Sequence, residues 1–409
     1  MRVAIIGAGA AGCFCAVNLK RWAPKCEINI YEAGTKALAK VAITGGGRCN
    51  LTNSWEGVKS LGQVYPRGER LMKRLLHQFD HEKTMEWWEN EGVRLVTQDD
   101  HCVFPQSQDA MQLVNLLTAH IKRMGIGLHT SHRVSKIEHN ENYSISFQDV
   151  KLKDAVADVV IVTAGGQPKE NGFDMLKPLN LNIEKPVPSL FTFCIADKEL
   201  TALQGVVVED AVASLAGTKC KAEGPLLITH WGMSGPAILK TSSQAARYLA
   251  DNAYKATLMV DWWPTVSQDD VMQFVQKQIK TNGNKQVNTI SPTPLTHRHW
   301  CYLVSRIGIA ETKRWNEIGK KDINRMVQLL KADTYQVDGK GQFKDEFVTC
   351  GGVSLNELDQ NTLECKQHKG LYFAGEVTDV DAVTGGFNLQ AAWTMGWVVA
   401  KAVADTTKG

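Results

Sequence analysis

The sequence lacks three features that would place it in a specialised class of protein. No apolar run reaches the length of a membrane-spanning helix, and no block of like charge is long enough for a nucleic-acid-binding tail. The 46 Lys and Arg residues nearly balance the 43 Asp and Glu residues, giving a net charge of +3. The ten cysteines include no CxxC pair, so we expect no metal site. We therefore predict no membrane partner and no direct nucleic-acid partner.

The N-terminus does not resemble an export signal. Only Arg2 precedes the apolar stretch Val3 to Ile6, which is too short for a signal core. We therefore expect a cytoplasmic protein. The 44% hydrophobic and 22% charged residues are ordinary for a soluble globular protein, and 409 residues allow two or three domains.

The start of the chain has a pattern typical of dinucleotide binding. A short apolar strand over residues 1–6 runs directly into Gly7-x-Gly9-x-x-Gly12, and a helix is predicted over residues 13–22. Gly7 is expected to make the tight turn, Gly9 to let the backbone reach a pyrophosphate, and Gly12 to let helix and strand pack closely. The free N–H groups at the start of the helix would attract the phosphates.

A second predicted strand, over residues 27–31, ends at Glu32. Glu32 lies twenty residues beyond Gly12, where a carboxylate can accept a hydrogen bond from an adenosine ribose hydroxyl. A tight strand-to-helix turn without a ligand would not explain this acid. The order of strand, glycine turn, helix, strand and acid therefore predicts a dinucleotide site.

A second glycine-rich element lies near the end of the chain. A predicted strand over residues 371–374 closes at Gly375-Glu376, and a loop containing Asp379 and Asp381 leads to Gly385-Gly386-Phe387. We predict that Asn388 caps a final helix with an apolar side. An extended cofactor held at both ends would place its diphosphate on the first helix and a flavin ring at the start of the last one. The alternative is an ordinary C-terminal strand and helix.

The third glycine-rich element is Thr44-Gly45-Gly46-Gly47-Arg48-Cys49-Asn50, followed by Thr52-Asn53. Consecutive glycines cost backbone entropy on folding, so they indicate a close approach of the backbone to another group. A purely structural loop with a solvated Arg48 is the alternative.

These elements, together with Thr229-His230-Trp231-Gly232-Met233-Ser234-Gly235-Pro236 and Cys350-Gly351-Gly352-Val353, span nearly the whole chain. In this order the sequence resembles the bacterial BaiN-type and aminoacetone-oxidase-like FAD-dependent flavoproteins of the two-dinucleotide-binding-domain superfamily. The resemblance implies FAD, a Rossmann-like FAD domain and an inserted middle domain. It also implies that the glycine loop wraps the cofactor near its diphosphate and ribityl part, with contacts from Lys40 and Thr44.

The resemblance implies two further contacts. Val134 is expected to place backbone groups against adenine, and Thr163-Ala164-Gly165-Gly166 resembles the second glycine element of the superfamily. The alternative for the latter is a strand-end turn. The complete set of predicted cofactor-binding residues is Gly7, Gly9, Ala10, Ala11, Gly12, Glu32, Ala33, Lys40, Thr44, Gly45, Gly46, Gly47, Arg48, Cys49, Asn50, Val134, Ala164, Gly165, Gly375, Glu376, Asp379, Asp381, Gly386, Phe387 and Asn388.

No catalytic side chain stands out. Related disulfide reductases carry a second cysteine five residues after the first, and here that position is Ser54, so a redox dithiol is absent. Cys49 is therefore expected to be structural, with a reactive thiol beside the flavin as the alternative. His230 is a weak candidate for a proton donor, because a lone histidine is more often structural.

The fold class that these observations predict is α/β. A discontinuous Rossmann-like FAD-binding domain covers residues 1–188 and 344–409, and the inserted domain covers 189–343. The insertion is predicted to be β-barrel-like over 189–263, from short alternating segments, and helical over 264–343. Within the first part we expect one amphipathic helix over 70–90, a turn over 101–105, a helix over 108–124, strands near 127 and over 132–137 and 143–147, and a buried strand over 158–163.

The expected activity is FAD-dependent hydride transfer through flavin N5, most simply NAD(P)H-driven reduction of a small organic substrate. The insertion contains no second strand-GxGxxG-helix unit, so binding of NAD(P)H, as a transient co-substrate, is not shown. One alternative is an oxidase that takes hydride from a small amine and passes electrons to oxygen. Another is a non-enzymatic FAD-binding accessory module. The substrate and the oligomeric state are left open.

Overall fold

The computed structural model describes residues 1–167, 169–341 and 348–407. Its internal contacts divide the chain into two units. The first unit comprises Met1–Val187 and Val348–Gly409, and the second comprises Pro188–Phe347. The expected return to the first domain near Lys344 lies outside the described residues.

A five-stranded parallel sheet forms the centre of the first unit, in the order β20-β10-β1-β2-β6. The central strand β1 is apolar and buried over Val3–Ile6, as expected for a parallel strand covered on both faces. The predicted Rossmann-like class is confirmed. The strands of this sheet are β1 (Arg2–Ile6), β2 (Glu27–Tyr31), β6 (Gly127–His129), β10 (Val159–Val162) and β20 (Leu371–Phe373).

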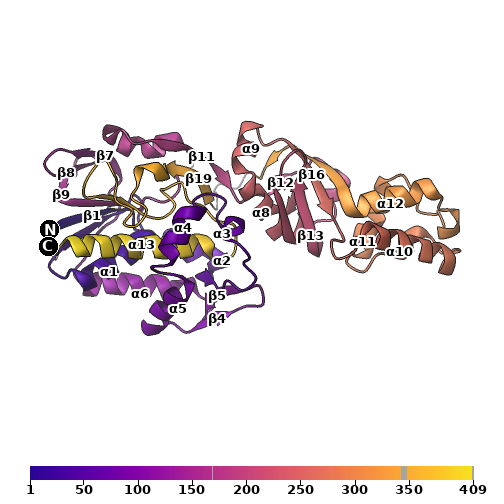
Figure 1. Ribbon diagram of the computed structural model, residues 1–409, viewed down its shortest axis with the longest axis horizontal. Helices are drawn as coiled ribbons and strands as arrows, with labels where there is room; N and C mark the ends of the chain where they lie inside the picture. The colour runs from indigo at the N-terminus through magenta and orange to yellow at the C-terminus, as the bar shows by residue number, and fades with distance from the viewer. Residues whose placement is uncertain (168, 342–347, 408–409) are drawn as a thin grey trace. The chain divides into compact units, whose positions relative to one another are not determined.

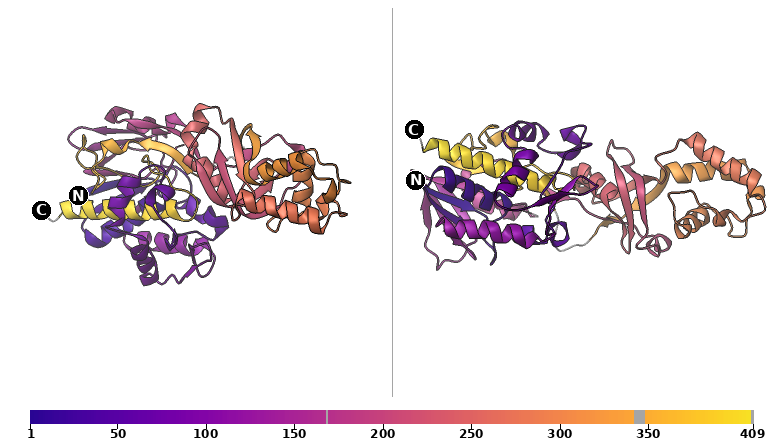
Figure 2. Two further views of the ribbon diagram at one scale, coloured as in Figure 1. Left: turned by 45° about the vertical axis from the view of Figure 1, so that its right-hand side comes forward. Right: turned by 90° about the horizontal axis from the view of Figure 1, so that it is seen from below.

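Two helices from opposite ends of the chain pack against each other in this unit. Figures 1 and 2 show α1 (Ala10–Trp22) and α13 (Phe387–Thr406) side by side, with α6 (Ala110–Arg123) next to α1. The approach is close because Gly396 has no side chain. A Cβ atom at Gly396 would lie 2.7 Å from the carbonyl oxygen of Ala11. This contact holds the middle of α13 against the first turn of α1.

Smaller elements complete the first unit. Two three-stranded antiparallel sheets have the orders β3-β5-β4 and β7-β8-β9, and β11 pairs with β19. The remaining strands and helices are β3 (Thr52–Asn53), β4 (Leu95–Thr97), β5 (Cys102–Pro105), β7 (Val134–His139), β8 (Tyr143–Phe147), β9 (Ala155–Ala157), β11 (Ile183–Ser189), β19 (Val348–Val353), α2 (Ala39–Gly47), α3 (Leu61–Val64), α4 (Glu69–Leu76) and α5 (His81–Asn90). Short 3-10 segments cover Glu170–Leu179 and Leu355–Glu357.

The prediction of one helix over residues 70–90 is wrong. Helix α4 ends at Leu76, and α5 begins at His81. The Asp80 carboxylate accepts a hydrogen bond from the Lys83 N–H at 2.9 Å and so caps the second helix. The predicted turn over 101–105 is also wrong in part, because Cys102–Pro105 forms the central strand of a small sheet.

The second unit contains a seven-stranded sheet and a group of helices. The sheet order is β17-β16-β13-β14-β15-β12-β18, and its adjacent strands are antiparallel. Its strands are β12 (Phe193–Cys194), β13 (Val207–Leu215), β14 (Lys221–Thr229), β15 (Gly232–Ser234), β16 (Ala256–Asp261), β17 (Asp333–Val337) and β18 (Gly339–Lys340). The helices are α7 (Lys198–Thr201), α8 (Pro236–Gln244), α9 (Ala246–Asp251), α10 (Gln268–Thr281), α11 (His297–Arg306) and α12 (Lys320–Ala332), with 3-10 turns at Val287–Thr289 and Trp315–Glu317.

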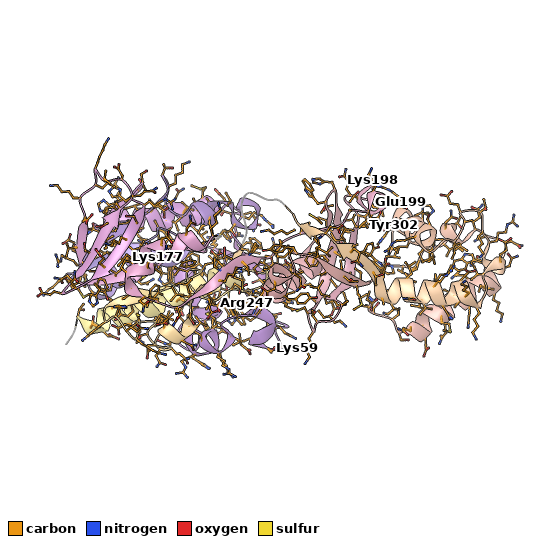
Figure 3. All side chains as sticks on the ribbon, turned by 90° about the horizontal axis from the view of Figure 1, so that it is seen from above. Lys59, Lys177, Lys198, Glu199, Arg247 and Tyr302 are labelled. Carbon is orange, nitrogen blue, oxygen red and sulfur yellow. The ribbon has the colours of Figure 1, made fainter. Side chains whose placement is uncertain are left out.

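Side-chain contacts join the helices of the second unit. Tyr302 of α11 donates a hydrogen bond to Asp197 Oδ2 at 2.8 Å, and the other oxygen of Asp197 caps α7. Figure 3 labels Tyr302 beside Lys198 and Glu199 of α7. Ser234 does not cap α8, because Gly235 holds that position and the Ser234 hydroxyl accepts from Thr192. No helix among the described residues is both long enough and apolar enough to cross a membrane.

Candidate active site

The three glycines of the first turn differ in their surroundings: Gly7 and Gly12 pack closely against the backbone, and Gly9 does not. A Cβ at Gly7, which has a φ of +107°, would lie 2.4 Å from the Thr163 carbonyl oxygen. A Cβ at Gly12 would lie 2.1 Å from the Gly7 carbonyl oxygen. A Cβ at Gly9 would meet nothing within 4 Å. The space beside Gly9 is therefore open to a ligand.

The start of α1 is equally open. Gly9 is its N-cap, and no side chain bonds to the free N–H groups of the first turn, which begins at Ala10 and Ala11. Those N–H groups and the helix dipole favour a phosphate. A diphosphate would fit here, because Gly9 leaves room for it and no side-chain cap occupies the start of the helix.

Glu32 lies against the same turn. Its two carboxylate oxygens accept from the Ala8 N–H at 2.8 Å and from the Gly34 N–H at 2.6 Å, with Ala33 between β2 and Gly34. These bonds hold the carboxylate at the edge of the cradle, where its remaining lone pairs can accept from a ribose hydroxyl. Thr163, which the sequence placed in the second glycine element, donates its hydroxyl to the Gly7 carbonyl oxygen at 2.9 Å and braces the turn, a contact that the sequence did not predict.

The glycine loop at the end of α2 has a left-handed backbone. Gly45, Gly46 and Gly47 have φ values of +59°, +69° and +83°, so a residue with a side chain would be strained at each position. A Cβ at Gly46 would meet no protein atom within 4 Å. Arg48 is exposed, lies 4.5 Å from the centre of the Phe104 ring, and donates to the Gly45 carbonyl oxygen at 3.2 Å.

Asn50 and Asn53 join this loop to the last helix. With the Asn50 amide assigned the orientation that satisfies both neighbours, its Oδ1 accepts from the Gly386 N–H at 3.1 Å and its Nδ2 donates to the Thr52 carbonyl oxygen at 2.9 Å. Asn53 Nδ2 donates to the Gly385 carbonyl oxygen at 3.2 Å. Two glycine-rich segments far apart in sequence therefore form one continuous wall.

The prediction that Asn388 caps the final helix is wrong. Gly386, with a φ of +86°, is the N-cap of α13, and no side chain caps the helix. Phe387 is the first helical residue, and Asn388 exchanges two hydrogen bonds with the backbone of Ala382, at 2.8 and 2.9 Å. The first turn of α13 therefore keeps free N–H groups, which can stabilise negative charge on a bound ring.

Cys49 is fully buried and has a φ of +62°. Burial raises the pKa of its thiol to about 12, so it is not a thiolate at neutral pH. Its backbone N–H donates to the Thr44 carbonyl oxygen at 3.0 Å, across the three glycines. The geometry is that of a structural residue that closes the glycine loop.

Acidic residues after β20 reach different partners. Glu376 accepts from the Thr349 N–H at 2.9 Å and pairs with Lys40 Nζ at 3.4 Å, which ties α2 to the end of β20. Asp381 is buried and accepts from Nε and Nη2 of the Arg67 guanidinium in a two-point ion pair. Asp379 donates its backbone N–H to the Val353 carbonyl oxygen. Asp381 is thus already paired, and Arg67 is a residue that the sequence did not single out.

The remaining predicted residues are distributed more widely. Gly165, with a φ of +72°, follows β10, and a Cβ there would lie 3.9 Å from Glu376 Oε2. Ala164 precedes it, and Gly375 opposes Ala11 at 3.1 Å when a Cβ is added. Val134 begins β7 in a separate sheet of the first unit. His230 lies in the second unit, exposed at the tip of the β14–β15 hairpin, with its ring 4.8 Å from that of Trp231.

The parallel sheet, the open glycine turn and the uncapped start of α13 define the class of protein: a flavin-dependent oxidoreductase with a Rossmann domain. The chain belongs to the family described as HI0933-like protein Rossmann domain, whose model matches residues 1–402. Curated relatives agree with this assignment, and a solved structure shares the fold.

Two curated relatives align over nearly the whole chain. The 3-dehydro-bile acid delta(4,6)-reductase of Clostridium scindens is 26% identical over 419 residues, covering 99% of each protein. The ribosomal RNA dihydrouridine synthase of Haemophilus influenzae is 26% identical over 414 residues, covering 98% of each. Among solved structures, the 3-ketosteroid delta1-dehydrogenase of Sterolibacterium denitrificans shares the fold with a TM-score of 0.50 at 11% identity, covering 99% of each chain.

Proposed function

We propose that this protein uses FAD to reduce a carbon–carbon double bond that is conjugated to a carbonyl, with NAD(P)H as the source of hydride. The observation that carries the proposal is the chemistry shared by the two relatives' names. One name describes reduction of ring double bonds in an oxidised bile acid, and the other describes formation of dihydrouridine. Both reactions add hydrogen to a double bond next to a ring carbonyl.

FAD, when bound, would accept hydride at flavin N5 and pass it to the substrate. The chain's own residues bind and orient the cofactor. The N–H groups at the start of α1, with Gly9, would hold the diphosphate, and Glu32 would hold the ribose. The uncapped N–H groups at the start of α13 would stabilise negative charge at the other end. We also propose that the remaining predicted residues contact the cofactor, among them Ala33, Lys40 and Val134.

The proposal gives no protonating role to Cys49 or His230. The Cys49 thiol is buried, with its pKa raised to about 12, and His230 is exposed at the tip of the β14–β15 hairpin. In this proposal the second hydrogen comes from solvent as a proton. Reduction then balances as one hydride from NAD(P)H and one proton added across the double bond.

Steady-state oxidation of NADPH by the FAD-loaded protein tests the proposal. Oxidation that depends on an added cyclic enone or on unmodified ribosomal RNA, with a product heavier by two hydrogens, would support it. The near-neutral charge predicts a small substrate rather than RNA. The RNA reaction therefore decides between the two substrate classes. Sustained turnover by purified protein would exclude a purely accessory role.

One observation favours a second candidate, an oxidase of a small amine. Within residues 188–341 no parallel strand pairing occurs, so the described part of the second unit contains no additional Rossmann-like unit for NAD(P)H. The oxidase would reduce its flavin with the amine and return the electrons to oxygen. Hydrogen peroxide formed from an amine without NAD(P)H would favour this function over the reductase.

A further inference from the structure

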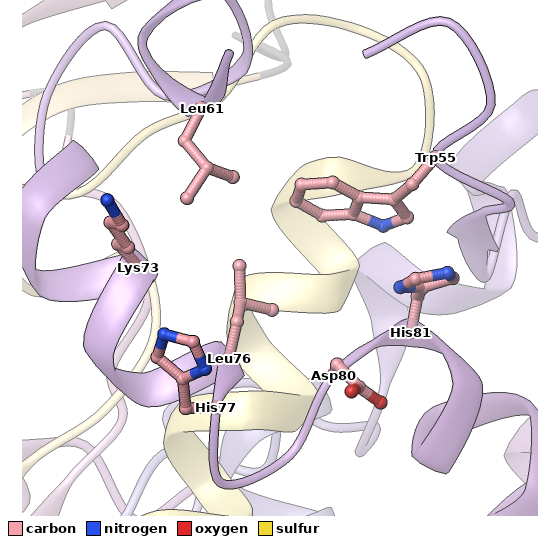
Figure 4. A pocket seen from close by; sticks show the side chains of 7 residues that line it. All are labelled: Trp55, Leu61, Lys73, Leu76, His77, Asp80 and His81. Atoms are coloured by element: carbon pink, nitrogen blue, oxygen red, sulfur yellow. The ribbon is translucent and has the colours of Figure 1, made fainter. Parts of the chain in front are cut away.

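A pocket of about 270 Å³ lies in the first unit, next to the start of α13. Its walls come from the loop after β3 and from α3, α4 and α5 (Figure 4). The lining residues are Trp55, Leu61, Lys73, Leu76, His77, Asp80 and His81. None of these residues belongs to the cofactor cradle described above.

Trp55 forms one wall of the pocket in a strained backbone conformation. Its φ is +65°, which is unusual for a bulky side chain. Such strain persists where the surrounding structure imposes it, and it is concentrated at functional sites. Here the Trp55 N–H donates to Asn53 Oδ1 at 2.8 Å, and Asn53 Nδ2 bonds to Gly385. Asn53 therefore couples the position of Trp55 to the glycine loop before α13.

Aromatic contacts continue this coupling. The Trp55 ring meets the Phe387 ring edge-on at 5.4 Å and lies 5.6 Å from the His81 ring, nearly parallel to it. Phe387 is the first residue of α13, where the flavin end of the cofactor is expected. The pocket wall and the proposed flavin site thus share one aromatic cluster.

The polar groups around the pocket are available to a ligand. The His81 side chain makes no hydrogen bond with the part of the chain that the structure describes. The Lys73 and His77 side chains likewise form no ion pair or hydrogen bond within the described ranges. The Asp80 carboxylate is already used as the cap of α5. Figure 4 shows the Lys73 and His77 side chains on one side of the pocket and Trp55 with His81 on the other.

We propose that this pocket binds an unsaturated ring that carries an anionic group. The ring would pack on Trp55 between Leu61 and Leu76, with His81 as its hydrogen-bonding partner, and the anion would lie at Lys73 and His77. The inference rests on the proposed function, because it assigns this ring to the substrate. A nucleotide phosphate and the carboxylate of a steroid enone offer the same chemistry, and the experiment separates them.

The test is isothermal titration of the full-length, FAD-loaded protein. The probes are uridine monophosphate, uridine, ribose phosphate and a steroid enone carboxylate. Trp55→Ala should weaken binding of the ring-bearing anion by roughly tenfold, since stacking contributes that much per ring. Lys73→Ala should weaken uridine monophosphate but leave uridine unchanged. His81→Ala removes the proposed hydrogen-bonding partner of the ring and should weaken binding. His297→Ala, which changes an exposed histidine in the second unit, is its matched control and should have no effect.

Leu61→Trp provides a second test if Trp55→Ala does not fold, because it fills the pocket without removing Trp55. If Leu61→Trp binds every probe with the same affinity as the native protein, the proposal is overturned. It is also overturned if neither ring-bearing anion binds to the native protein. Preference for uridine monophosphate would identify a nucleotide, and preference for the steroid a small carboxylate. If the pocket variants lose probe binding while reduced flavin transfers hydride to no unsaturated ring, the pocket stands and the proposed function fails. If the pocket variants bind the probes as the native protein does while the enzyme still reduces an unsaturated ring, the proposed function stands and the pocket assignment fails.

Discussion

Asn50 and Gly386 connect the glycine loop to the last helix: the Asn50 side-chain oxygen accepts from the Gly386 N–H at 3.1 Å. Asn50→Ala would leave this N–H without its partner, which costs about 1–3 kcal/mol. We expect FAD affinity to fall by roughly tenfold, because the loop and the helix would no longer be held together. Fluorescence of released FAD measures the change. Asn140→Ala, at an exposed position, is the control, and an equal loss there would contradict the assignment.

The open space at Gly9 predicts a contrast with Gly12. Gly9→Val should fold but lose FAD, because its side chain would enter the space left for the diphosphate. Gly12→Val should fail to fold, because its Cβ would lie 2.1 Å from the Gly7 carbonyl oxygen. Thermal unfolding and bound FAD per chain separate the two effects. A Gly9→Val protein with a full complement of FAD would show that the cofactor does not approach this turn.

Cys49 should be dispensable for redox chemistry. Since burial raises its thiol pKa to about 12, alkylation at neutral pH should be slow. Cys49→Ser should keep bound FAD and most turnover, with a stability cost of about 1–3 kcal/mol from burying a hydroxyl. Loss of turnover with FAD retained would instead establish a reactive thiol.

The buried pair of Arg67 and Asp381 should stabilise the loop before α13. Arg67→Met would leave a buried carboxylate without its cation and should cost about 3–5 kcal/mol of unfolding free energy. The double variant Arg67→Met/Asp381→Asn removes the charge as well and should recover part of the loss. Urea unfolding measures both. A double variant no more stable than Arg67→Met would show that the ion pair is not the source of the effect.

His299 predicts how stability depends on pH. It is fully buried in α11, and burial lowers its pKa from 6.5 to about 4. Below pH 6.5 the unfolded chain therefore binds a proton that the folded chain does not, so stability falls as pH decreases towards 4. Between pH 7 and pH 5 the loss should be about 2 kcal/mol. Urea unfolding of His299→Leu should lack this component, and an unchanged pH slope would contradict the assignment.

The part of the first unit that the sequence predicted best is the strand-turn-helix segment, where the backbone must approach another group closely. Glycine at positions 7, 9 and 12, and Glu32 after β2, follow from the strand-turn-helix pattern alone. The FAD-dependent class and the inserted middle domain were implied by the family resemblance that the longer motifs carry. The glycine turn and its acid are local in sequence, so a pattern of residues is sufficient to reveal them.

Other features depend on contacts between distant segments. The break between α4 and α5 was missed because apolar residues continue across it, and only the Asp80 cap marks the second start. Asn388 was assigned to a cap, but the left-handed Gly386 ends the preceding loop two residues earlier. Arg67 and Trp55 carry no local signal, since their partners Asp381 and Phe387 lie more than 300 residues away.

The most direct test of the account is to purify the protein, quantify bound FAD, and mix it anaerobically with NADH or NADPH while recording the oxidised flavin band. The account predicts one FAD per chain and loss of the band on mixing, followed by its return when a conjugated carbonyl substrate is added. A protein that carries no FAD, or whose flavin stays oxidised with both nucleotides, would contradict it.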